Sequence, residues 1–361
     1  MTPPSIRRAL QLLPGYATTG IGSLPHTQLE LAMQMAFQVD IPYLPQLPAG
    51  NPSELMIAAA LDGLPGLRFD SEGVCTVELA EWEASRSAFG ASIERALDSG
   101  ELSAFEPSVR ACRAWKPFLW EIENRKLAFA KVQIAGPATV LWITKASSGS
   151  PASELAELDQ QIFRLLLSKC LAMVRAIRRT SATPILYLDE PGLYALDRRN
   201  ARHLLTLQEL RVLTLAIQRE GALVGLHCCS NTDWAAILDL GLDLISLDVR
   251  LSLDALLEEK DAFWRYLIGG STLSLGIIPT DIKSSFAVRE LVDSVEASLE
   301  ATLGSRRFRE MAPQLVLTPA CGLALRTVLD AERTFDQLRQ AQKSLTRLLE
   351  PREQVAGQLP S

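Results

Sequence analysis

The sequence lacks any uncharged apolar run that approaches the roughly 20 residues needed to span a bilayer as a helix. Its first residues show no signal-peptide pattern, because Pro3, Pro4, Arg7 and Arg8 lead into no long apolar core. Clusters of Lys and Arg are also missing, and the formal net charge is −6. These absences predict a cytoplasmic protein that binds neither membranes nor nucleic acids.

Histidine is scarce, with three residues in 361, and there are six cysteines. Thiols stay reduced in the cytoplasm, so six cysteines do not indicate three disulfides. Cys228 and Cys229 are adjacent, which favours a metal or reactive site over a structural bridge. Most free cysteines are small buried hydrophobic residues, and this is the interpretation for Cys75, Cys112 and Cys170.

Short apolar runs alternate with longer amphipathic stretches along most of the chain. The runs show little internal alternation, which is typical of buried parallel strands joined by crossover helices. The predicted strands span residues 18–22, 41–44, 129–134, 185–188, 223–226, 244–247, 273–278 and 315–318. The predicted helices span residues 29–38, 153–180, 201–219, 234–240, 288–303 and 325–349. Eight strands in one chain of this size predict an α/β fold, the (β/α)8 TIM barrel.

Residues 67–123 do not fit this alternation and predict an insertion of a hairpin and helical segments. The hairpin is expected at 68–79, with Gly73 near its turn. Residues 1–350 are predicted to form one domain, and residues 351–361 a frayed tail.

Polar side chains closely follow several of the predicted strands. Ser23 follows the first strand, Asp189 the fourth, His227 the fifth, Asp248 the sixth and Cys321 the eighth. In a TIM barrel the C-terminal ends of the strands ring one mouth, where active sites form. The topology therefore predicts that these residues, which are distant in sequence, converge.

The chemistry of three of these positions indicates zinc. His227 and Cys229 are two positions apart and point the same way in extended backbone, while Cys228 turns aside. Zinc accepts imidazole nitrogen and thiolate sulfur in tetrahedral geometry. Cys321 supplies a third ligand, and Asp248 could supply an oxygen. The alternative is that the cysteines are small buried residues and that Asp248 caps a helix.

Six short motifs occur in order over most of the chain. They are I-G-S-L-P-H-T at 21–27, G-P-A-T at 136–139, L-D-E-P-G-L at 188–193, H-C-C at 227–229, D-L-I-S-L-D at 243–248 and P-A-C-G-L at 319–323. Together they resemble the C-terminal catalytic barrel of cobalamin-independent methionine synthase, in the superfamily shared with uroporphyrinogen decarboxylase. G-P-x-T alone is unspecific, whereas the ordered set is specific.

The resemblance implies a zinc-dependent methyltransferase of methionine and amino-acid biosynthesis. Its acceptor would be a thiol, first of all homocysteine, which would become methionine. The family's ligand pattern places Zn²⁺ on His227, Cys229, Asp248 and Cys321. The family has Glu where this chain has Asp248, which is one methylene shorter.

The resemblance also implies how the acceptor binds. Asp189 would contact the substrate amino group as a catalytic residue, and the turn of Ile21, Gly22 and Ser23 would hold the carboxylate through N–H and hydroxyl donors. Taken without the resemblance, Asp189 and Ser23 could be helix caps and Gly22 a turn glycine.

Two further departures from the family concern catalysis and the methyl donor. The catalytic His after the seventh strand is missing, and Asp281 is the candidate proton shuttle in its place. The family's pterin-binding segment is replaced by a loop at 41–52 that is rich in Pro and Gly. The expected donor is therefore either methyltetrahydrofolate or a methylated corrinoid protein. Alternative functions are a non-catalytic zinc- or thiol-binding accessory protein and a uroporphyrinogen decarboxylase-like enzyme, whose Arg-rich N-terminal motif is absent here.

Overall fold

A parallel sheet of six strands forms the centre of the computed structural model, which describes residues 14–281 and 287–349. The predicted tail at 351–361 lies outside the described residues. The strand order is β3-β5-β6-β7-β8-β9, and the sheet is curled. The strands are β3 (Phe129–Ala135), β5 (Thr183–Asp189), β6 (Leu223–Cys228), β7 (Leu244–Asp248), β8 (Thr272–Ile278) and β9 (Val316–Pro319). Each corresponds to a predicted strand.

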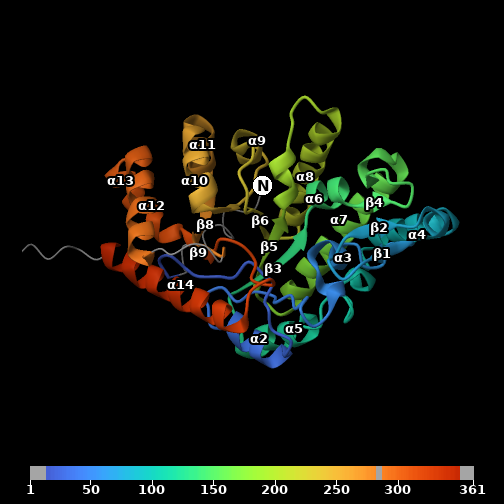
Figure 1. Cartoon of the computed structure of the whole chain (residues 1–361), viewed down its shortest axis with the longest axis horizontal. Helices are drawn as coiled ribbons and strands as arrows, with labels where there is room; N and C mark the ends of the chain where they lie inside the picture. Colours follow the sequence, from blue (N-terminus) through green and yellow to red (C-terminus); the bar gives the residue numbers. More distant parts are fainter. Residues whose placement is uncertain (1–13, 282–286, 350–361) are drawn as a thin grey trace, which may run out of the picture.

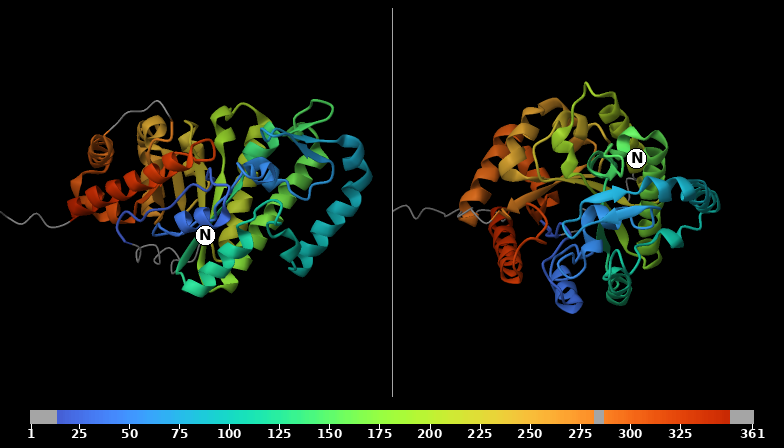
Figure 2. Two further views of the ribbon diagram at one scale, coloured as in Figure 1. Left: turned by 60° about the horizontal axis from the view of Figure 1, so that its bottom comes forward. Right: turned by 45° about the vertical axis from the view of Figure 1, so that its right-hand side comes forward.

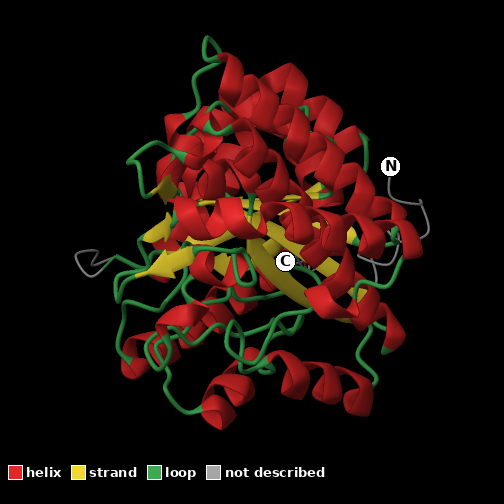
Figure 3. Cartoon of the chain, turned by 90° about the vertical axis from the view of Figure 1, so that its right-hand side faces the viewer, coloured by secondary structure: helices red, strands yellow, loops and turns green. Residues whose placement is uncertain are grey.

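These strands are buried on both faces, as their apolar runs predict. Every residue of β3, β6, β8 and β9 is buried. Figure 3 shows why: the strands lie in the interior, with helices packed above and below them. A parallel strand covered in this way has no solvent face that would require polar alternation.

The first two predicted strands, at 18–22 and 41–44, are present only as isolated bridges among the described residues. Thr18 bridges Leu317 of β9, and Tyr43 bridges Lys131 of β3. The two segments therefore adjoin opposite edges of the sheet. The structure shows a six-stranded parallel sheet, and it does not show the closed eight-stranded barrel that the sequence predicts.

A local reason for the missing ladders lies in the residues themselves. Pro42 and Pro45 have no N–H to donate, and a proline is poorly tolerated inside a sheet. Gly22 has φ 152, a conformation in the region that favours glycine. Ile41 N nevertheless donates to Thr18 O at 3.0 Å, so the two segments contact each other.

Helices cover the sheet, and all six predicted helices are present with end points that differ by a few residues (Figure 1). The α-helices of the described residues, apart from the long helix beside the hairpin, are α2 (Leu29–Ala36), α3 (Met56–Ala60), α5 (Trp115–Arg125), α6 (Pro137–Ile143), α7 (Ala156–Arg179), α8 (Ala201–Arg219), α9 (Trp234–Leu238), α10 (Val249–Glu258), α11 (Lys260–Ile268), α12 (Val288–Leu303), α13 (Ser305–Met311) and α14 (Val328–Leu349). Short 3-10 helices are η1 (Pro52–Glu54), η2 (Ser103–Phe105), η3 (Ala152–Glu154), η4 (Pro191–Ala195) and η5 (Ala312–Gln314). Within the described ranges, none of the helices combines the length and apolarity that crossing a bilayer requires.

The predicted hairpin is confirmed. β1 (Leu67–Phe69) pairs antiparallel with β2 (Cys75–Val77), and Gly73 in the turn has φ 83. β2 also pairs parallel with β4 (Lys145–Ala146), which makes a second, small sheet. With the long helix α4 (Leu79–Ser99), these strands lie at one end of the molecule in Figure 1 and in the left view of Figure 2.

Candidate metal centre

Three predicted ligands meet at the carboxyl-terminal edge of the sheet. His227 is the second-last residue of β6, Cys229 directly follows that strand, and Cys321 comes two residues after β9. Because the strands are parallel, their carboxyl ends share one edge. One ligand atom from each residue lies within 4.8 Å of the other two. The structure therefore brings together residues that are almost a hundred positions apart.

The imidazole of His227 is oriented by a hydrogen bond on the side away from the sulfurs. Its Nδ1 lies 2.9 Å from Oγ of Ser246. Its Nε2 is buried and has no hydrogen-bond partner among the described residues. Buried polar atoms are rarely left unpaired, so an orphaned imidazole nitrogen beside two cysteines points to a missing partner. Histidines that bind metals typically donate the other ring N–H in this way.

The two sulfurs differ in their affinity for protons. A hydrogen bond from Cys321 lowers the pKa of the Cys229 thiol to about 4. The nearby His227 adds to this effect, and burial opposes it. The same hydrogen bond raises the pKa of Cys321, and burial adds to this effect. A divalent cation bound between the two sulfurs would displace the proton of the hydrogen bond between Cys321 and Cys229.

The donor set fits zinc. One imidazole nitrogen and two thiolates are typical zinc ligands, and a catalytic site keeps the fourth position for water or substrate. Cys228 is excluded from the set because it is buried and its Sγ donates to Ser230 O at 3.2 Å. Its neighbour Cys229 is half-buried, as is Cys321.

Asp248 is not part of this ligand group among the described residues. Its Oδ1 accepts a hydrogen bond from Arg250 N at 2.8 Å, so the side chain caps α10. Burial raises the pKa of Asp248, and the Arg250 N–H partly offsets that rise. The structure therefore places the Asp248 carboxylate as a helix cap, which is the alternative stated for this residue.

Asp281 also lies apart from the ligand group. Its carboxylate forms an ion pair with Arg250 at 2.9 Å, and its side chain is exposed. The preceding residue, Thr280, lines the cavity beside the metal ligands instead. The structure thus does not bring the predicted proton shuttle to the sulfurs.

A cavity of about 340 Å³ opens at the group of His227, Cys229 and Cys321. Ile21, Ser23 and Asp189 line it together with His227, Cys229 and Cys321, and Gly22 lies between the first two in the chain. The cavity also contacts the Pro-rich loop through Pro48. The turn at 21–23 and the group of His227, Cys229 and Cys321 therefore share one space.

Asp189 lines this space. The residue is buried, and its Oδ1 has no hydrogen-bond partner among the described residues. It does not cap a helix, because Glu190 takes the N-cap position of η4. Burial raises the pKa of Asp189 to about 6, against the opposing charges of His227 and Lys131. A carboxylate in this state suits a cationic ligand group.

Two cations near the site were not predicted from the sequence. Lys131 is buried in β3, and burial lowers its pKa to about 8 while the charge of Asp189 opposes that effect. Arg326, five residues after Cys321, is half-buried and lines the cavity. A signal for Lys131 existed: Lys131 and Gln133 interrupt an otherwise apolar strand at positions that share one face.

Comparison with protein-family models finds no match, and comparison with curated proteins finds none either. Among solved structures, a methyltransferase from Methanosarcina mazei is similar, with a TM-score of 0.51, 14% sequence identity, and coverage of 94% of this chain and 97% of that chain. A B12-independent methionine synthase from Shewanella sp. W3-18-1, in complex with selenomethionine, has a TM-score of 0.42 and 12% identity, and covers 64% of this chain and 67% of that chain. The first likeness shows a shared fold.

Proposed function

We propose that this chain is a zinc-dependent methyltransferase that methylates a thiol, with homocysteine as the first candidate acceptor. The observation that carries the proposal is the group of His227, Cys229 and Cys321, with a buried imidazole Nε2 that lacks a partner. The fold shared with the Methanosarcina mazei methyltransferase is compatible with this assignment. We further propose that segments 17–23 and 41–46 take the places of the first two strands of a barrel.

Zinc bound at this group would lower the pKa of an acceptor thiol and hold its thiolate at neutral pH. The thiol proton passes to solvent, a sulfur–carbon bond forms, and the bond between the methyl group and its donor breaks. Three protein ligands leave the fourth position to the acceptor. Asp248, the fourth ligand that the resemblance implies, accepts the Arg250 N–H at Oδ1 and would join only by moving toward the group.

The side chains around the cavity match the two ends of an amino acid. The unpartnered Asp189 would pair with an α-ammonium group, which fixes the acceptor sulfur relative to the ligands. Ser23 and the backbone beside it would donate to the carboxylate. This pairing is the reason for preferring homocysteine to a simple alkyl thiol.

Metal analysis tests the proposal. The protein is purified from zinc-replete cells, and its zinc is quantified alongside Cys229→Ser and Cys321→Ser. Cys228→Ser is the matched control, because this adjacent thiol donates to Ser230 O instead of joining the group. We expect about one zinc per chain in the wild type and the control, and loss in the other two variants. A metal-free wild type would overturn the proposal.

The methyl donor requires a separate assay. Methyl transfer to homocysteine is measured from methyltetrahydrofolate and, in parallel, from methylcobalamin as the probe for a methylated corrinoid protein. Activity with one donor identifies its class.

A zinc- or thiol-binding accessory protein is the second candidate. The observation that favours it is the ion pair of Asp281 with Arg250, which engages the candidate proton shuttle elsewhere. Zinc and homocysteine binding without transfer from either donor would favour this candidate.

A further inference from the structure

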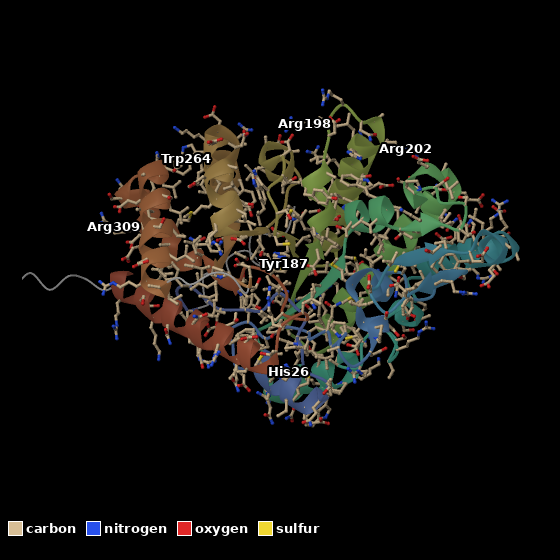
Figure 4. The ribbon with its side chains drawn as sticks, in the orientation of Figure 1. His26, Tyr187, Arg198, Arg202, Trp264 and Arg309 are labelled. Carbon is tan, nitrogen blue, oxygen red and sulfur yellow. The ribbon has the colours of Figure 1, made fainter. Side chains whose placement is uncertain are left out.

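Lys131 carries a positive charge into the interior of the protein. Its side chain projects from β3 and is only 2% exposed. The ammonium lies over the ring of Tyr187 at 4.8 Å from the centroid, and Figure 4 shows Tyr187 at the centre of the molecule. Burying an ammonium is unfavourable unless its donors are used, so the contacts of Lys131 indicate its role.

Those contacts lead to the turn at 21–23. Lys131 Nζ donates to Ile21 O at 2.7 Å and to Gln133 Oε1 at 3.1 Å. No carboxylate lies within ion-pair distance of Nζ among the described residues, and the one charge that acts on it electrostatically is that of Asp189. The ammonium thus holds a backbone carbonyl directly, and its charge acts on Asp189 from beyond ion-pair distance.

Gln133 continues the same connection two positions along β3. Its Nε2 donates to Leu44 O at 2.8 Å and lies 3.3 Å from Gln46 Oε1. A Cβ atom added to Gly22 would lie 2.4 Å from that Nε2, so the amide packs directly against the turn. Lys131 and Gln133 therefore connect the segments 18–22 and 41–44 to β3 by hydrogen bonds.

Packing alone does not account for a lysine here. A methionine of similar length would fill the space beside Tyr187 without an ammonium to desolvate. What methionine could not do is fix the Ile21 carbonyl. That bond holds this carbonyl toward β3, and the trans peptide then directs the Gly22 N–H the opposite way.

We propose that Lys131 is a positioning residue for the acceptor, and that it favours thiols that carry an acid group. Lys131 fixes the turn from the side of β3. Its positive charge raises the electrostatic potential where Ser23 lines the cavity. The choice of acceptor class rests on the proposed function. We call the connection of Lys131 to the turn the brace, and it rests on the hydrogen bonds of Lys131 to Ile21 and Gln133.

Thiol binding to zinc-loaded protein tests this proposal by calorimetry. The ligands are homocysteine and its decarboxylated analogue, an aminopropanethiol. In Lys131→Met we expect homocysteine affinity to fall about tenfold or more, because a charge-assisted bond is lost, and aminopropanethiol affinity to stay within about twofold. Lys131→Arg should recover part of the loss. Zinc content should match the wild type in both variants.

Ser274→Ala is the matched control, since it removes a buried hydroxyl whose hydrogen bond, within the described part of the chain, goes to Tyr187 and not to the turn. The proposal would be overturned if Lys131→Met bound each thiol with the same affinity as the wild type. It would also be overturned if the substitution lowered the affinity for both thiols equally. Gln133→Leu provides a second test if Lys131→Met does not fold, with the same selective loss expected.

A readout without substrate separates the brace from the proposed function. If the wild type binds neither thiol, the proposed function fails, and amide hydrogen exchange at Gly22 and Ser23 then tests the brace. We expect faster exchange in Lys131→Met than in wild type or Ser274→Ala. Unchanged exchange would contradict the brace.

Discussion

His227 and Ser246 are register partners on neighbouring parallel strands, and the histidine Nδ1 lies 2.9 Å from the serine hydroxyl. This hydrogen bond fixes the ring at Nδ1 and leaves Nε2 without a partner among the described residues. Ser246→Ala should therefore lower zinc affinity by about 10- to 100-fold, the range found for partners that orient a ligand. Competition with a chromogenic chelator measures this change.

Ser274→Ala is a close control for that experiment. Ser274 pairs with Ser246 in register on the adjacent strand, and its hydroxyl bonds Tyr187. Both variants lose one buried hydroxyl from the same layer. A similar fall in zinc affinity in both would show that the Ser246 effect is a general loss of packing.

The convergence of the ligand residues could be predicted from sequence because it follows from topology. His227 and Cys321 each come at or just after the carboxyl end of an apolar run, and parallel strands place those ends at one edge. The direction in which a side chain points at such an end could not be predicted from the sequence. Asp248 caps α10 and Asp281 pairs with Arg250, and both outcomes depend on local hydrogen bonds that spacing does not specify.

The missing parts of the fold have similar causes. Segments 18–22 and 41–44 carry strand-like apolar residues, but prolines remove donors from the second, and each makes only single bridges. Helices α10 and α11 were not predicted because they follow each other closely within one crossover. Lys131 was overlooked because a charged residue in an apolar run looks like an exception, whereas its partner is a carbonyl a hundred positions away.

Glu209 should make stability depend on pH. Burial, with the nearby Asp159, raises the pKa of Glu209 to about 7. A carboxyl whose pKa is raised on folding binds protons more tightly in the folded state. Its contribution is therefore present at low pH and is lost as pH rises from about 4.5 through about 7.

Glu209→Gln should flatten that dependence. We expect the variant to match the wild type near pH 5 and to exceed its free energy of unfolding by about 1 kcal/mol at pH 8, a modest value because solvent screens a partly buried group. Urea denaturation at both pH values measures the difference. A variant that is less stable than the wild type at pH 8 would contradict this electrostatic account.

Gly276 should tolerate no side chain. A Cβ there would lie 2.6 Å from Leu247 O and 2.8 Å from Ala320 Cα, which are backbone atoms of both neighbouring chain segments. Gly276→Ala should lower the free energy of unfolding by about 2 kcal/mol or more. It should also weaken zinc binding, because Ala320 precedes Cys321. Gly241→Ala, at a positive φ but in open space, should lose about 1 kcal/mol and keep its zinc.

Arg326 should contribute to binding of acidic ligands at the cavity. It lines the cavity and is half-buried, whereas Arg333 on α14 is exposed and does not line it. Both arginines act on Asp330, so they share an electrostatic neighbour. Arg326→Gln should raise the KM for homocysteine several-fold with little change in kcat, and Arg333→Gln should leave both unchanged. An equal effect of both substitutions would assign the change to net charge.

Zinc K-edge X-ray absorption, recorded before and after addition of homocysteine, tests most directly whether this chain presents a thiol on a metal held by His227, Cys229 and Cys321. The account predicts two sulfur ligands at about 2.3 Å and at least one nitrogen in the free protein. Homocysteine should raise the sulfur count from two to three. Zinc without sulfur ligands, or a sulfur count that homocysteine leaves at two, would contradict it.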